Sequence, residues 1–266
     1  MRHARFPLKT SSATTQPRTV REHPLPLAIP AFGHLEWAER FPWLVQGTTA
    51  RGNEGTPFDL RLFGREPVAA VLERWRALRR ATACPRAVHA YQVHGARVLE
   101  HRMGPEGLLI ADDGDGHVTA ASGTLLTVSV ADCVPVFLVA PERRVVAALH
   151  AGWRGVAAGV IEAGVDLLRR SYGVAPDALH VHLGPAICGE CYEVGPEVHE
   201  ALRLPRPDGN MPVDLRKTAA RRAEAVGVRG DRITVSAFCT RCGDSPFFSH
   251  RAGCTERQVG FIGMLN

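Results

Sequence analysis

The 266-residue sequence has no run of eighteen uninterrupted apolar residues, and its basic start lacks a following apolar segment with a small-residue cleavage site. Signals for membrane insertion and for export are therefore both missing, and we expect a cytoplasmic protein that does not associate with membranes. Seven cysteines cannot all pair, and thiols stay reduced in the cytosol. We therefore expect free thiols, available as metal ligands or nucleophiles, rather than disulfides.

Aromatic residues are also scarce, at 6% of the chain. The net charge of +5 is concentrated in residues 1–30, which carry +4 and leave +1 for the rest. A nearly neutral body with few aromatic rings lacks the basic surface and the stacking groups that a nucleic-acid binder needs. We therefore exclude nucleic acid as a partner.

Residues 1–30 hold five of the nineteen prolines and show little apolar periodicity. Such a segment cannot offset the entropy of its own ordering by burial. The sequence predicts a disordered basic extension over residues 1–30, removable without loss of fold, followed by a single domain over residues 31–266.

Within that domain, apolar residues recur at helical spacing in some segments, and Val- and Leu-rich runs suggest strands in others. Because strands and helices alternate irregularly, we predict an α+β fold with mixed β-sheets. The expected helices span 68–80, 156–172 and 214–226, and the expected strands 87–99, 125–139 with an interruption at 132–133, 145–150, 179–183 and 233–236.

Three candidate metal ligands, His94, Cys133 and His150, lie in or at the ends of these strands. One thiolate and two imidazoles form a known catalytic zinc shell whose fourth position is open, and such a metal lowers the pKa of bound water toward neutrality. Taken singly, however, a histidine or cysteine in a strand is more often a plain core residue. Spacings of 39 and 17 residues also match no short metal motif, so the residues alone leave the question open.

Five segments resemble the signature blocks of the laccase-domain family, the multicopper polyphenol oxidase-like proteins that include purine nucleoside phosphorylases with adenosine deaminase activity. They agree in order and spacing over residues 40–266. The segments are QVHGARV, ADCVPVFLVA, HAGWRG, GPAICGECYEVG and FFSHR.

The resemblance implies that His94, Cys133 and His150 bind the metal, which is zinc, with copper as the alternative. It also implies a layered αββα sandwich, a monomer, and the purine nucleosides adenosine, inosine and methylthioadenosine as substrates together with phosphate.

Candidate catalytic residues are Asp132, which would orient a ligand histidine or accept protons, and Arg154, which with the Gly152–Gly155 turn would hold phosphate. Arg51 and Arg251 are candidates for binding the substrate anion. Asp132 and Arg154 also have simple structural interpretations, as a strand-end carboxylate and a surface charge. Glu193 is a second candidate for the proton transfer that deamination needs.

Some positions depart from the family pattern and bear on substrate preference. They are the segment Asp59–Leu62, His250 where the family usually has Tyr, and Glu256 where it has Gly.

Two other functions fit the same residues. Cys133 could be the nucleophile of a metal-free cysteine hydrolase with a histidine partner, and the chain could be a non-catalytic module that binds a nucleoside. Bound zinc separates the first alternative from a metalloenzyme, and turnover of adenosine separates the second.

Two further motifs are weaker. Cys188-x-x-Cys191 and Cys239-x-x-Cys242 could form a four-thiolate zinc ribbon, but the 47 residues between them exceed the usual spacing, which favours incidental thiols. A single His180-x-His182 pair, for which we expect one imidazole inside and one outside, falls short of the several pairs a multicopper oxidase needs. Polyphenol oxidase activity is therefore not expected.

Overall fold

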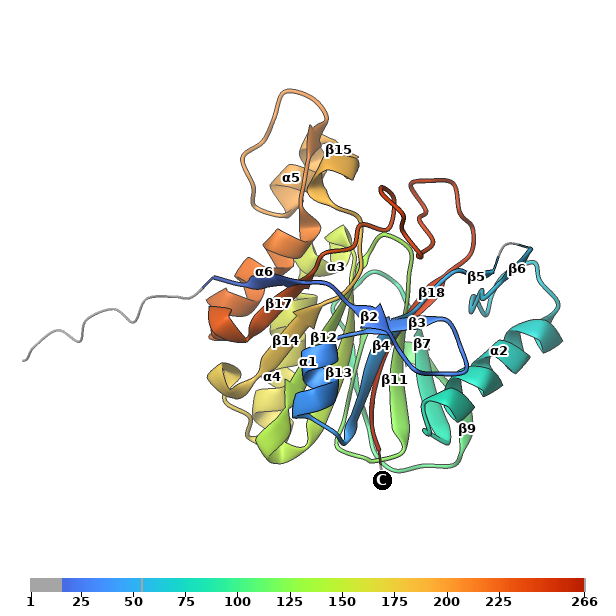
Figure 1. The fold of residues 1–266 in the computed structure, drawn as a ribbon. Coiled ribbons are helices and arrows are strands. Elements are labelled where there is room, and N and C mark those ends of the chain that lie inside the picture. Colours follow the sequence, from blue (N-terminus) through green and yellow to red (C-terminus); the bar gives the residue numbers. More distant parts are fainter. Residues whose placement is uncertain (1–15, 54, 266) are drawn as a thin grey trace, which may run out of the picture.

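Two seven-stranded sheets pack face to face in the computed structural model, which describes residues 16–53 and 55–265 (Figure 1). Both contain parallel and antiparallel pairs, which confirms the prediction of mixed sheets. In order, the first sheet contains β1 (Arg18–Val20), β17 (Ile233–Ser236), β14 (His180–Leu183), β12 (Val134–Ala140), β13 (Val145–Ala151), β10 (Gly116–Thr119) and β8 (Val98–His101). The second contains β2 (His23–Pro24), β3 (Ala31–Gly33), β4 (Leu44–Thr49), β18 (Gln258–Met264), β11 (Thr124–Val130), β7 (Arg86–Tyr91) and β9 (Gly107–Asp113).

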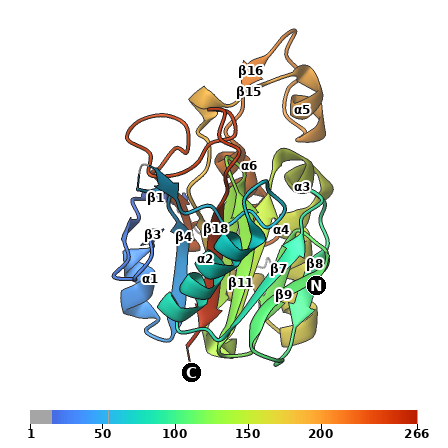
Figure 2. The same cartoon turned by 90° about the vertical axis from the view of Figure 1, so that its right-hand side faces the viewer.

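Helices cover the outer face of each sheet, which confirms the αββα layering (Figures 1 and 2). The first sheet packs against α3 (Trp153–Ala158), α4 (Val160–Tyr172) and α6 (Leu215–Ala225), and the second against α2 (Val68–Ala81). Smaller elements are α1 (Leu35–Arg40), α5 (Pro196–Ala201), the hairpins β5 (Gly52–Asn53) with β6 (Thr56–Pro57) and β15 (Glu193–Val194) with β16 (Met211–Pro212), and 3-10 turns at Pro141–Arg143, Pro176–Ala178, Gly189–Cys191 and Gly230–Arg232.

Strand periodicity decides which side chains enter which layer. In β13, Ala147 and Leu149 face the helices, whereas Val146 and Ala148 lie between the sheets. His150 follows the second set, so its imidazole belongs on the face between the sheets.

The predicted helices occur, with one break. α2 matches its predicted range, and Asp214 caps α6 by accepting the backbone N–H groups of Arg216 and Lys217. The helix predicted over 156–172 is instead α3 and α4, because Gly159 adopts a positive φ of 91° between them. The strand predicted over 87–99 is likewise divided into β7 and β8 by a turn at residues 92–97.

The prediction of a disordered extension over 1–30 is wrong for its second half, while residues 1–15 lie outside the described residues. β1 pairs with β17, β2 pairs with β3, and Glu22 is 2% exposed. The Glu22 carboxylate pairs with His182 Nε2 at 3.0 Å and accepts Ser236 Oγ at 2.8 Å. Short segments without periodicity can still be ordered by strands supplied from elsewhere in the chain.

His180 and His182 are both buried, contrary to the expectation of one inside and one outside. Residues two apart in a strand share a face, and both rings lie among aromatic side chains. His180 meets Phe41 edge-on, and His182 stacks on Phe137.

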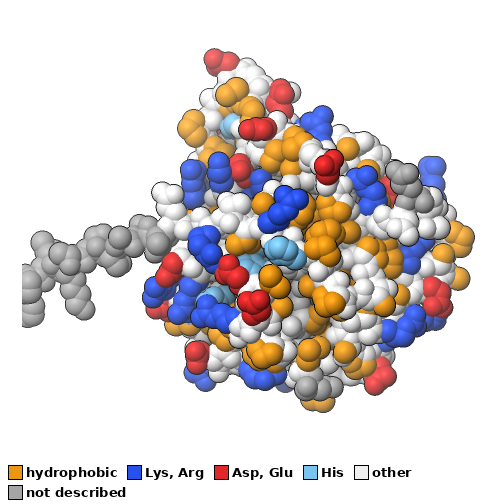
Figure 3. All heavy atoms as spheres, viewed as in Figure 1, with side chains coloured by type: hydrophobic (Ala, Val, Ile, Leu, Met, Phe, Trp, Pro, Cys, Tyr) orange, Lys and Arg blue, Asp and Glu red, His pale blue; other side chains and the backbone are white. Residues whose placement is uncertain are grey.

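In the described part of the chain, no helix combines the length and the apolar character required to cross a membrane. On the face drawn in Figure 3, positive and negative side chains are interspersed.

Candidate metal centre

The turn after β7 presents His94, and Asp115 holds the turn in place. The Asp115 carboxylate is fully buried and accepts the backbone N–H groups of Val93 at 3.2 Å, His94 at 2.9 Å and Gly95 at 2.7 Å. These bonds support the left-handed backbone of His94, whose φ of 60° is unfavourable for a residue with a Cβ.

The same carboxylate fixes His150 on β13. Asp115 Oδ1 lies 2.8 Å from His150 Nδ1, and the His150 backbone N–H donates to the Asp115 carbonyl at 2.7 Å. Because a carboxylate accepts, Nδ1 carries a proton and Nε2 is the ring nitrogen that faces Cys133. Burial lowers the pKa of His150, but the Cys133 thiolate and the hydrogen bond to Asp115 raise it to about 9, so without a metal the ring is protonated. One buried acid therefore positions both histidines.

Cys133 lies between β11 and β12 and completes the group. One ligand atom from each of His94, Cys133 and His150 lies within 4.8 Å of the others. Gly152 lies directly behind them, since a Cβ there would come within 3.0 Å of Cys133 Sγ and 3.1 Å of the His94 ring. The first glycine of the HAGWRG segment is therefore required by close approach to this site.

Electrostatics favour a thiolate at Cys133. Burial raises the pKa of the thiol, but the charge and hydrogen bond of His150, with a smaller contribution from His94, bring this pKa down to about 6. Burial also raises the pKa of Asp115, yet the hydrogen bonds from His150 and Gly95 leave it below its ordinary value. A thiolate and a carboxylate thus flank the His150 ring.

Asp132, next to Cys133, makes no side-chain hydrogen bond to His94 or His150, and Asp115 orients the histidines instead. The Asp132 carboxylate accepts Thr240 Oγ1 at 2.6 Å and the backbone N–H of Arg251 at 2.7 Å. Its φ of 87° is a strained value for a non-glycine residue. Asp132 therefore connects the Cys133 loop to the loop that precedes β18.

Each of the three predicted anion-binding arginines has a contact of its own within the protein. Arg154 is exposed and stacks over Trp153 at 4.2 Å, and Arg51 donates to the Phe247 carbonyl at 2.6 Å. Arg251 donates to the Glu193 carbonyl and lies over the Tyr192 ring. None of the three lines the pocket beside the histidines.

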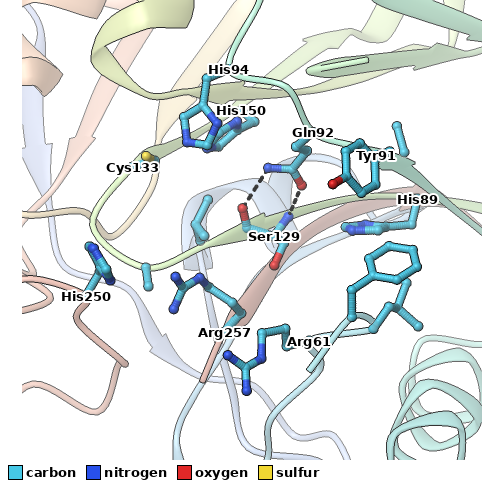
Figure 4. Close-up of a pocket in the computed structure, with 15 residues that line it drawn as sticks. Arg61, His89, Tyr91, Gln92, His94, Ser129, Cys133, His150, His250 and Arg257 are labelled. Atoms are coloured by element: carbon cyan, nitrogen blue, oxygen red, sulfur yellow. Dashed lines mark hydrogen bonds between the residues drawn. The ribbon is translucent and has the colours of Figure 1, made fainter. Parts of the chain in front are cut away.

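That pocket has a volume of about 540 Å³ and extends from the His–Cys group to two other arginines, Arg61 and Arg257 (Figure 4). Its wall is lined by Arg61, Leu62, Phe63, His89, Ala90, Tyr91, Gln92, His94, Ser129, Val130, Ala131, Cys133, His150, His250 and Arg257. Gln92 is fixed by a pair of hydrogen bonds to the backbone of Ser129, at 2.9 and 2.6 Å.

Buried Asp59 places both pocket arginines. Its Oδ1 accepts the backbone N–H groups of Arg61 and of Arg257, each at 2.9 Å. Two segments almost 200 residues apart in sequence are thereby held together at the pocket. Among the lining residues, the exposed rings of Phe63 and Tyr91 meet edge-on at 5.6 Å.

Sequence reasoning missed Asp59, Asp115, Arg61 and Arg257 as site residues. Asp115 is one of three acids in Asp112–Gly116, and nothing local distinguishes the buried one. Arg61 and Arg257 lie in segments that had been noted for departing from the family pattern, so that departure was the available signal.

A thiolate and two oriented imidazoles at the base of an open pocket define a candidate three-ligand metal centre on an αββα sandwich. Residues 55–265 match the family described as multi-copper polyphenol oxidoreductase laccase. The chain belongs to this family.

Relatives and solved structures agree with that assignment. "Purine nucleoside phosphorylase YlmD" of Geobacillus stearothermophilus is 35% identical over 212 residues, which cover 74% of this chain and 75% of that protein. "Adenosine deaminase RL5", from an unknown prokaryotic organism, is 38% identical over 150 residues, covering 52% and 56%. The crystal structure of YlmD superimposes with a TM-score of 0.82 at 31% identity, covering 90% of this chain and 97% of that one.

Proposed function

We propose that this chain is a zinc-dependent purine nucleoside phosphorylase that also deaminates adenosine, acting on adenosine, inosine and methylthioadenosine. The observation that carries the proposal is the Asp115 carboxylate, which orients His150 and holds the His94 turn beside Cys133. The names of the relatives support the substrate class.

The residues fit a zinc ion. Zinc bonds of about 2.0–2.3 Å to nitrogen and sulfur place the ligand atoms within about 4 Å of each other. The ligand atoms of His94, Cys133 and His150 already lie within 4.8 Å of one another. Cys133 Sγ, His150 Nε2 and His94 would hold the ion. Bound there, zinc would supply a Lewis acid that activates water near neutral pH. The proposal places the enzyme in the cytoplasm, where Cys133 stays reduced.

The pocket also fits a purine nucleoside and phosphate. A volume of about 540 Å³ falls in the usual range for small-ligand sites. The Phe63 and Tyr91 rings offer apolar faces to a purine base, and the Arg61 and Arg257 guanidinium groups offer charge to phosphate. In deamination, the chain would hold C6 of adenosine toward the three ligands. In phosphorolysis, the arginines would hold phosphate toward the ribose C1′ while the purine leaves.

A second candidate rests on the low pKa of Cys133. A thiolate beside a buried histidine is also what a metal-free cysteine hydrolase needs. Polyphenol oxidation gains no such support, since His180 and His182 are enclosed by aromatic side chains.

The test combines elemental analysis with product identification from adenosine, with and without phosphate. We expect zinc in the purified full chain, inosine without phosphate, and adenine plus ribose 1-phosphate when phosphate is added. His94→Ala, at an exposed position, should remove this zinc and both activities without unfolding the protein. His23→Ala, at an exposed position in β2, is the matched control.

Contrary results have distinct meanings. Full zinc content and normal turnover in His94→Ala would refute the metal assignment. Loss of deamination alone would place phosphate chemistry at another site. An active protein free of metal and inactivated by thiol alkylation would favour the cysteine hydrolase.

A further inference from the structure

Four cysteines outside the candidate centre meet at one edge of the first sheet. Cys188 and Cys191 follow β14, and Cys239 and Cys242 follow β17. These strands are parallel neighbours, and an isolated parallel bridge between Ala186 and Cys239 continues their pairing. Because β14 and β17 are parallel, their C-terminal ends lie at the same end of the sheet. The two cysteine pairs are therefore adjacent, although 47 residues separate them in sequence. The long spacing therefore does not keep the two pairs apart.

The four sulfurs are close enough together to share one metal ion. All four Sγ atoms lie within 4.8 Å of one another, and Cys188 Sγ lies 3.9 Å from Cys242 Sγ. A Zn–S bond of about 2.3 Å implies an edge of about 3.8 Å between two sulfurs of a tetrahedron. A disulfide would require about 2.05 Å between the bonded sulfurs.

Backbone amides also converge on one sulfur. Cys239 Sγ accepts N–H groups from Cys188 at 3.2 Å, Arg241 at 3.4 Å and Cys242 at 3.5 Å. Amide donors around a sulfur stabilise its thiolate form and orient it, as the surroundings of metal-bound cysteines do. The donors come from both loops, so this arrangement depends on the two loops being held together.

We propose that Cys188, Cys191, Cys239 and Cys242 bind a structural zinc ion through four thiolates, at a closed site separate from the His94–Cys133–His150 centre. Four sulfur ligands in tetrahedral arrangement select zinc or an iron–sulfur centre. An iron–sulfur cluster would need inorganic sulfide as well, whereas four thiolates alone complete the shell of a structural zinc ion, so we choose zinc.

The site would fix one side of the candidate centre. Thr240 lies between the ligands Cys239 and Cys242, and its hydroxyl donates to Asp132 beside Cys133. Arg241 donates to the Cys191 carbonyl, and the Ile187 N–H donates to the Asp132 carbonyl at 3.1 Å. The structural zinc would therefore hold the two loops that support the Cys133 turn.

Metal content of the full chain and its variants tests the proposal. We expect two zinc ions per chain in the wild type and one each in Cys133→Ser and in the double variant Cys239→Ser/Cys242→Ser. Cys254→Ser, which alters a cysteine outside both groups, should keep two. The double variant should also melt at a lower temperature.

Two measurements keep the test decisive if the double variant fails to fold. X-ray absorption on Cys133→Ser, which retains only the proposed site, should show zinc with four sulfur neighbours at about 2.3 Å. Thiol titration of the unfolded wild type in chelator without reductant should count all seven cysteines.

Three results would overturn the proposal. They are a Cys133→Ser protein without zinc, a count of three thiols because the four cysteines form two disulfides, and iron in place of zinc. None of them would alter the separate expectation for His94→Ala, so failure of this proposal and failure of the proposed function are distinguishable.

Discussion

Asp115→Asn is the sharpest test of how the candidate centre is built. Each carboxylate oxygen accepts two hydrogen bonds: Oδ1 from His150 Nδ1 and the His94 N–H, Oδ2 from the Val93 and Gly95 N–H groups. An asparagine replaces one oxygen by an NH₂ group. Whichever way the amide turns, two donors then face a donor.

A fully buried donor without an acceptor costs about 1–3 kcal/mol, and the backbone N–H groups here are partly buried, so the metal-free variant should lose about 2 kcal/mol of unfolding free energy. Because Asp115 also orients His150, zinc affinity should fall by about 10- to 100-fold. Urea unfolding measures the first quantity, and competition with a chromogenic chelator measures the second.

Asp113→Asn is the control, since this neighbouring carboxylate is exposed and should change neither quantity. Zinc affinity within about twofold of wild type, together with unchanged stability, would refute the role assigned to Asp115.

Three further outcomes are expected. Arg61→Ala should raise KM for phosphate by about tenfold or more and leave deamination unchanged. Arg154→Ala, outside the pocket, should change neither the KM for phosphate nor the rate of deamination. The same rise in KM for phosphate in both variants would reject the assignment of phosphate binding to Arg61. Deleting residues 1–30 should lower the melting temperature and reduce the unfolding free energy by about 3 kcal/mol, because it removes β1, β2 and Glu22, the buried partner of His182. An unchanged melting temperature would contradict this. Stability should fall as the pH drops from about 6.5 toward 4. In the folded state, burial lowers the pKa of His34 to about 3 and the pKa values of His89, His101 and His180 to about 4, so the unfolded chain takes up protons first. Each of these groups should lower the unfolding free energy by up to ~1.4 kcal/mol per pH unit in this range. Urea midpoints across this range that did not change would refute that reasoning.

The sequence by itself determined the class of fold and the three candidate ligands. Period-2 and helical apolar patterns are local, so α2, α6 and the central strands could be predicted within a few residues. The ligand set followed from segments whose order along the chain resembles a known family. The structure gives a physical reason for one glycine of these segments, because Gly152 lies close to Cys133 and His94.

Only the tertiary structure decided which polar residues serve the site. Asp115, Asp59, Arg61 and Arg257 act through contacts between segments far apart in sequence, and no local pattern encodes such contacts. The two cysteine pairs show the same limit, because their meeting depends on β14 and β17 being parallel neighbours. Strand order in a sheet is set by the packing of the whole chain, so the spacing between two motifs does not reveal whether they end at the same edge.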